Sequence, residues 1–137
     1  MTRLAAILLL LVACGLGCTT HIKAGARGKI VDATTGQPVQ GARITRPYMP
    51  EAFPGARWDV PPGGLPALTV ASDRHGHFDL PPYRRSDFTL VSHLTPHGAD
   101  GHFEITADGY ETITIRGRAT AQTAWRVEAG EVLLKKP

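Results

Sequence analysis

The feature that most constrains the fold of this chain is the alternation of apolar and polar residues that recurs along most of its length. Short alternating runs cover residues 28–32, 42–45, 68–72, 77–80 and 103–107, with turns rich in glycine or proline between them. A period of two is typical of strands with one buried face, whereas an amphipathic helix repeats every 3.6 residues. No segment shows a convincing helical repeat. The sequence therefore predicts an all-β fold.

Two turns carry residue types that indicate hairpins. Asp73 and Gly76 stand at the first and last positions of a four-residue turn, where type I turns prefer aspartate and glycine. Asp108 and Gly109 form a second hairpin signal. We therefore expect the alternating runs on either side of each turn to pair with one another.

Further strands are predicted over residues 88–91, 110–116 and 125–134, with a bulge or bend at Ala129 and Gly130. The chain then has seven or eight short strands, which predicts an antiparallel β-sandwich. The apolar residues that alternate toward one face are expected to form its core, and they are Ile30, Ile44, Phe78, Leu80, Phe103, Ile105, Ile113 and Ile115.

The beginning of the chain predicts a cellular location. Arg3 supplies one positive charge, and residues 4–13 form an unbroken apolar run. That run is shorter than the roughly 20 residues that span a bilayer, but it has the length of the apolar region of a signal peptide. It ends on Leu11-Val12-Ala13-Cys14, which resembles the lipobox of bacterial lipoproteins. The resemblance implies that residues 1–13 are removed and that Cys14 carries acyl chains.

The same family resemblance offers a second cysteine, Cys18, as an alternative lipid attachment site. Residues 15–18 end on Cys18, but Gly15 stands where the family usually has a leucine, so Cys14 is the predicted lipid attachment site. Ordinary secretion without a lipid, or a misread start of the chain, would also fit the apolar run. Residues 14–25 lack apolar periodicity and are predicted to be a flexible tether. No aspartate follows Cys14, which in this family favours the outer membrane of the cell envelope over the inner.

Composition bounds the remainder of the chain. Without residues 1–13 the chain keeps 14 basic against 12 acidic residues, a net charge of about +2. That charge is too small and too dispersed to indicate nucleic-acid binding. The length is sufficient for one domain, predicted over residues 26–137. Two cysteines do not make a disulfide framework.

Three ordered segments resemble a carboxypeptidase regulatory-like domain. They are the opening over residues 28–44, the pattern of Asp73, Gly76, Phe78 and Leu80, and Gly109 with Tyr110. The resemblance covers residues 26–116 and implies a seven-stranded transthyretin-like or immunoglobulin-like sandwich over the whole domain. Such domains are normally non-catalytic and accompany peptidases, outer-membrane transporters and surface proteins. This chain departs from the family in two long inserts, residues 46–67 and 81–101.

The first insert is the most distinctive candidate for a binding surface. Residues 47–66 contain six prolines and three glycines, which exclude a helix or an interior strand. They also contain Tyr48, Phe53 and Trp58, three of the nine aromatic residues of the chain. On a stiff loop these rings could bind an envelope protein or a saccharide. Alternatively, they fold back and cover one edge of the sandwich.

A metal-dependent enzyme or metal-binding protein is the alternative function. Five histidines follow the predicted tether, with three aspartates nearby: His75, His77, His93, His97 and His102, and Asp73, Asp79 and Asp100. Histidine and carboxylate together are the usual ligands of zinc or iron. No spacing among them matches a known metal-binding motif, so we predict neither a metal nor another cofactor.

Other enzymes with a related fold fit less well. A transthyretin-like hydrolase is expected to end in a Tyr-Arg-Gly-Ser-like tail, which residues 133–137 lack. An intradiol dioxygenase uses two tyrosines and two histidines around ferric iron. Tyr48, Tyr83 and Tyr110 are present, but the chain is short for that family, and Tyr110 matches a structural position of the regulatory-like domain. No Gly-x-Ser-x-Gly elbow is present. We therefore predict a membrane-anchored, non-catalytic binding or structural module.

Overall fold

The computed structural model describes residues 17–50, 63–89 and 98–137. These residues form nine strands and no helix. The strands are β1 (Gly17–Lys23), β2 (Gly25–Asp32), β3 (Arg43–Arg46), β4 (Leu68–Ala71), β5 (His77–Leu80), β6 (Tyr83–Thr89), β7 (Ala99–Thr106), β8 (Ile113–Ala119) and β9 (Arg126–Leu134). The predicted all-β fold is therefore confirmed.

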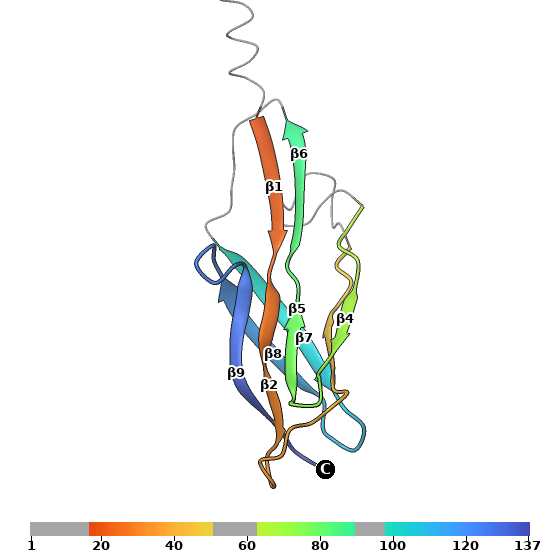
Figure 1. Cartoon of the computed structure of the whole chain (residues 1–137). Helices are drawn as coiled ribbons and strands as arrows, with labels where there is room; N and C mark the ends of the chain where they lie inside the picture. The colour runs from red at the N-terminus through yellow and green to blue at the C-terminus, as the bar shows by residue number, and fades with distance from the viewer. Residues whose placement is uncertain (1–16, 51–62, 90–97) are drawn as a thin grey trace, which may run out of the picture.

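Seven of the strands form two sheets that pack into a sandwich (Figure 1). One sheet has the order β5-β2-β9, and the other has the order β4-β3-β7-β8. Every pair within them is antiparallel except β2 and β9, which run parallel because the last strand returns beside the first strand of the sandwich. The sandwich is therefore antiparallel, as predicted, except at this one pair.

Strands β1 and β6 continue the β2–β5 pair beyond the sandwich as a two-stranded ribbon (Figure 1). Within the sandwich, Ala26 pairs with Leu80. Lys23, three residues earlier, pairs with Tyr83, three residues later, so the antiparallel register is unchanged. The prolines at 81–82 stand between these pairs and have no N–H to donate. They interrupt the ladder without shifting the strands.

This ribbon corrects the prediction of a flexible tether over residues 14–25. From Gly17 onward that segment is strand β1, followed by Ala24, which is buried. Its partner, β6, belongs to the second insert and lies far along the chain, so the local composition of residues 14–25 contains no sign of the pairing. The strand predicted over residues 88–91 begins earlier, at Tyr83, and residues 90–91 lie outside the described residues.

The turn between Asp73 and Gly76 forms as predicted, but the strands that flank it do not make a hairpin. Asp73 Oδ1 accepts hydrogen bonds from the backbone N–H groups of His75 and His77, at 2.8 and 2.9 Å. Gly76 N–H donates to the carbonyl of Asp73 at 2.9 Å. Strand β4 then pairs with β3, and β5 pairs with β2 in the other sheet. The turn therefore carries the chain between the sheets.

The other two predicted turn features are confirmed. Strands β7 and β8 pair around the turn at Asp108 and Gly109. In β9 the pairing with β2 steps from Glu128 to Gly130, which leaves Ala129 without a partner in the ladder. This is the predicted bulge, and its Gly130 has a positive φ of 64°.

The core lies between the two sheets and contains the residues predicted for it. Six of the eight predicted residues are buried, and the other two, Ile113 and Ile115, are partly buried and pack against them. Phe103 is fully buried and is the largest such side chain of the described residues. Alternation within short strands therefore located the core correctly.

A carboxylate at the end of β2 joins distant parts of the sandwich. Asp32 Oδ1 accepts hydrogen bonds from the N–H groups of Thr34 and Thr35, at 2.8 and 2.9 Å. Its Oδ2 accepts the Tyr110 hydroxyl at 2.8 Å and lies 3.3 Å from Lys136 Nζ. The Thr35 N–H, the Tyr110 hydroxyl and the other donors hold the pKa of Asp32 well below its usual range.

This lowered pKa predicts a loss of stability in acid. Folding favours the ionised Asp32, so its contribution is present above the pKa of an unfolded aspartate, about 3.9. The contribution is lost as the pH falls below that value. We expect Asp32→Asn to reduce the difference in urea midpoint between pH 7 and pH 3. Asp108→Asn, at an exposed turn, should leave the difference unchanged; equal differences in wild type and Asp32→Asn would contradict the prediction.

Candidate functional site

A cavity of about 740 Å³ opens at the end of the sandwich where the ribbon leaves it. Its walls come from the junction of β1 and β2, from the end of β3, and from facing parts of β7 and β8. The apolar part of the lining consists of Ala24, Pro47 and Met49. The volume lies within the roughly 300–1,000 Å³ that is typical of small-molecule sites.

The cavity opens because β3 ends at Arg46. Its pairing with β7 reaches Thr45, and Pro47 then lacks the N–H that would extend the ladder. Met49 pairs instead with Leu65. The Leu65 N–H donates to the Met49 carbonyl at 2.8 Å, and the Met49 N–H donates to the Leu65 carbonyl at 3.1 Å. This departure from the sheet leaves space beside β7.

Arg46 is a charged residue of the cavity wall that is almost completely buried. Its side chain is only 5% exposed. One guanidinium nitrogen, Nη1, donates to the Pro81 carbonyl at 3.2 Å, whereas Nε is buried and has no hydrogen-bond partner among the described residues. Burial lowers the pKa of Arg46, but a guanidinium remains charged in proteins. None of the ion pairs within the described part of the chain involves Arg46.

The other charged residues of the lining make the cavity electropositive. Lys23 is buried at the junction of β1 and β2, and Arg116 lies at the exposed rim on β8. Asp100 is the one carboxylate among the described lining residues, and His102 lies on the same strand, β7. Three permanent cations against one carboxylate favour an anionic occupant.

The residues predicted as a binding surface fall near the cavity only in part. Tyr48 is 58% exposed, and its two chain neighbours line the cavity. Phe53 and Trp58 lie outside the described residues, as does the predicted lipid attachment site, Cys14. Leu65, from the same insert, is fully buried, and its backbone pairs with that of Met49.

The described histidines are not brought together. The side chain of His75 accepts a hydrogen bond from Arg74 Nε at 3.0 Å, so one of its ring nitrogens is already engaged. His77 is on β5, and His102 lines the cavity on β7. His93 and His97 lie outside the described residues. Within residues 17–50, 63–89 and 98–137, no group of three or more His, Cys, Asp or Glu could hold a metal ion.

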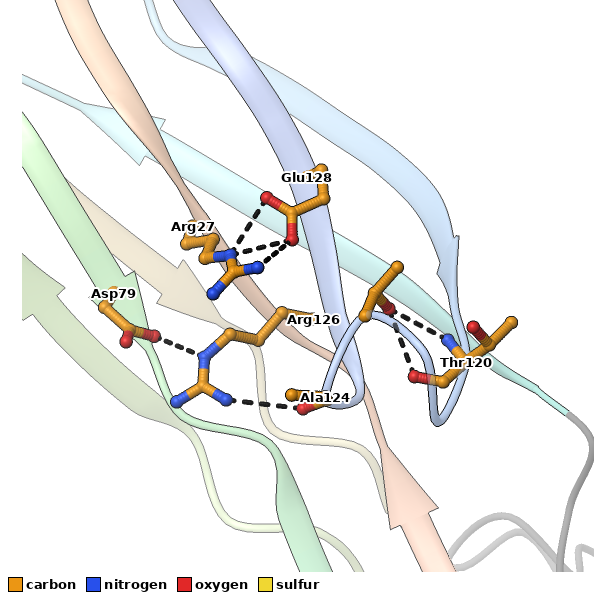
Figure 2. Close-up of polar contacts among 7 residues, drawn as sticks. Arg27, Asp79, Thr120, Ala124, Arg126 and Glu128 are labelled. Carbon is orange, nitrogen blue, oxygen red and sulfur yellow. Dashed lines mark hydrogen bonds and ion pairs between the residues drawn. The ribbon is translucent and has the colours of Figure 1, made fainter.

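Ion pairs on the outer face of the β5-β2-β9 sheet form a second charged cluster (Figure 2). Arg27 Nε donates to both carboxylate oxygens of Glu128, at 2.7 and 2.9 Å. Arg126 Nε donates to Asp79 at 2.6 Å and its Nη1 donates to the Ala124 carbonyl at 3.3 Å. Because these charges are paired near the surface, they join neighbouring strands at modest energetic benefit.

Sequence reasoning missed Arg46, although a signal was present. Ala42, just before β3, and Ile44 within it point inward, and the same period places residue 46 inward. A charged residue at an inward position is rare in a strand and calls for a polar partner or a ligand. The burial of Lys23 had no such signal, because the composition around it predicts a tether.

No protein-family model and no curated protein match this chain. Among solved structures it is similar to 3-chlorocatechol 1,2-dioxygenase from Rhodococcus opacus 1CP, at 16% sequence identity and a TM-score of 0.46. The match covers 87% of this chain and 60% of that structure. A likeness this distant does not indicate function. The described residues contain no helix long and apolar enough to cross a membrane.

Proposed function

We propose that this protein is a lipid-anchored component of the bacterial cell envelope and that its β-sandwich is a non-catalytic binding module. The observation that carries the binding role is the cavity of about 740 Å³ with the buried Arg46 in its wall. A buried cation with an unused donor is costly for a folded domain unless something binds there. A structural spacer would have no need of such a site.

The anchoring role is supported by the lipobox-like residues 11–14, which end on Cys14. They close an apolar run that has the length of the apolar region of a signal peptide. Strand β1 begins three residues after this cysteine and is seven residues long. At about 3.3 Å per residue, β1 spans roughly 23 Å, and the ribbon would hold the sandwich that far from Gly17. Paired strands make a stiffer spacer than the flexible tether expected from composition. The absence of aspartate after Cys14 favours the outer membrane.

A non-catalytic role is supported by the kind of residue around the cavity. Arginine and lysine hold anions well, and three of them line the cavity against one histidine and one carboxylate among the described lining residues, His102 and Asp100. The resemblance to carboxypeptidase regulatory-like domains points the same way. The ligand then reaches the cavity as a small molecule or as an exposed group of an envelope protein or saccharide.

The anchor is tested by substitution of each cysteine in the full chain, expressed from its own signal peptide in a Gram-negative host. We expect intact-mass analysis to show a mature chain that starts at Cys14 with acyl chains attached. Cys14→Ser should abolish acylation and move the protein out of the detergent-soluble membrane fraction, because stable anchoring needs two or more chains. Cys18→Ser is the matched control and should remain acylated. Loss of the lipid in Cys18→Ser alone would assign the anchor to Cys18.

A further inference from the structure

We propose that the cavity binds an organic anion whose carboxylate or phosphate group contacts Arg46 and whose apolar part lies against Pro47 and Met49. This inference rests on the proposed binding function and names its ligand class. It assigns Arg46 as the principal anion contact.

Arg46 is buried in the cavity wall with an unsatisfied hydrogen-bond donor. Arg46 lines the cavity and is 95% buried, since only 5% of its surface is exposed. Its Nη1 is engaged by the Pro81 carbonyl, while Nε donates to no atom of the described residues. Buried donors are satisfied in the great majority of cases, so an unsatisfied one calls for an explanation. The guanidinium also has no ion pair among the described residues, so an anion in the cavity beside Arg46 would offset its buried charge.

The guanidinium group of Arg46 determines which charge and shape the acceptor should have. A guanidinium presents parallel N–H groups that match the two oxygens of a carboxylate or phosphate. The remaining charges of the lining add Lys23 and Arg116 against Asp100. A neutral acceptor would leave the buried charge of Arg46 without an ion pair among the described residues, whereas an anionic oxygen group would supply one.

The cavity also has an apolar wall. Ala24, Pro47 and Met49 form part of the same lining, and the cavity is far larger than an inorganic anion requires. Apolar walls with a few placed polar groups are typical of sites for organic molecules. The ligand class is therefore an organic anion and not an inorganic ion alone.

The test uses the isotope-labelled full chain, purified in detergent, and three related probes: phenyl phosphate, benzoate and neutral benzyl alcohol. We expect both anions to shift the NMR signal of the Arg46 Nε–H group, because the negative charge binds beside the guanidinium. Comparison of the two anions distinguishes a phosphate from a carboxylate ligand. Benzyl alcohol should leave this signal in place.

Calorimetry with matched variants measures the contribution of Arg46. Arg46→Met should weaken binding of the preferred anion by about tenfold or more, the loss expected for a hydrogen bond to a charged group. Arg43→Met removes an exposed arginine from the same strand and should leave the affinity unchanged. Without ligand, Arg46→Met should unfold at a temperature no lower than wild type, since replacing a buried ion by an apolar side chain is often neutral or stabilising. If Arg46→Met does not fold, Arg46→Lys, which keeps the charge and removes Nε, serves in its place.

Some outcomes overturn the inference and leave the binding module standing. Benzyl alcohol that binds as tightly as the anions, or affinity unchanged in Arg46→Met, would show a cavity that binds without anion recognition. A marked loss of thermal stability in both ligand-free Arg46→Met and ligand-free Arg46→Lys would make Arg46 a structural residue. If no probe perturbs any residue of the cavity, both the anion class and the binding role fail, whereas the lipid anchor is decided by the cysteine variants.

Discussion

Replacement of Phe103 by alanine is expected to lower the free energy of unfolding by about 3–5 kcal/mol. Phe103 is fully buried between the sheets. Its ring lies so close to Gly101 that a Cβ there would be 2.5 Å from it, so the residue beside the ring has no side chain with which to fill the void. The loss should appear in urea or guanidinium unfolding curves of the full chain as a large decrease in the midpoint.

The matched control for this truncation is Leu133→Ala, which shortens an apolar side chain that is 53% exposed on β9. The loss of unfolding free energy should be small, because truncation of an exposed side chain removes little buried surface and leaves no cavity. A Phe103→Ala protein that unfolds at the wild-type midpoint would show that the core is not where the two sheets meet.

The second large effect is expected from Gly76→Ala in the turn between the sheets. Gly76 has a φ of 80°, and a Cβ added there would lie 2.3 Å from the backbone carbonyl oxygen of Ile30. The left-handed backbone costs a non-glycine residue about 1–2 kcal/mol. Displacing β2 from its position adds roughly 1–3 kcal/mol, the usual range for overpacking. Backbone atoms cannot rotate away as a flexible side chain can.

Gly109→Ala separates these two contributions. Gly109 also has a φ of 80°, but a Cβ at this position would meet no atom of the described residues within 4 Å. It should therefore lose only the backbone part, about 1–2 kcal/mol. Equal losses of unfolding free energy in the two variants would show that Ile30 does not approach the turn as closely as described.

The two inserts limited what could be predicted about the site. The sequence pattern places Arg46 and Met49 at the start of a proline-rich loop, yet they form one wall of the cavity. Lys23 belongs to a segment predicted to be flexible, yet it also lines the cavity, at the end of a strand, β1, that pairs with β6. A cavity is formed by segments that are distant in the sequence, and neither composition nor periodicity indicates which of them come together in space. Of the predicted aromatic surface, only Tyr48 lies among the described residues.

The amino-acid sequence by itself determined most strands of the two-sheet sandwich, their inward faces and the turn residues, because each of these follows from neighbours two to four positions apart. Phe78 and Leu80 alternate inward whatever they pair with, and Asp73 caps its own turn. Only the tertiary structure decided which strands lie side by side. Hydrogen-bonding edges do not depend on side-chain identity, so the sequence could not tell that β4 and β5 would separate, that β9 would run parallel to β2, or that a buried arginine would face an open cavity.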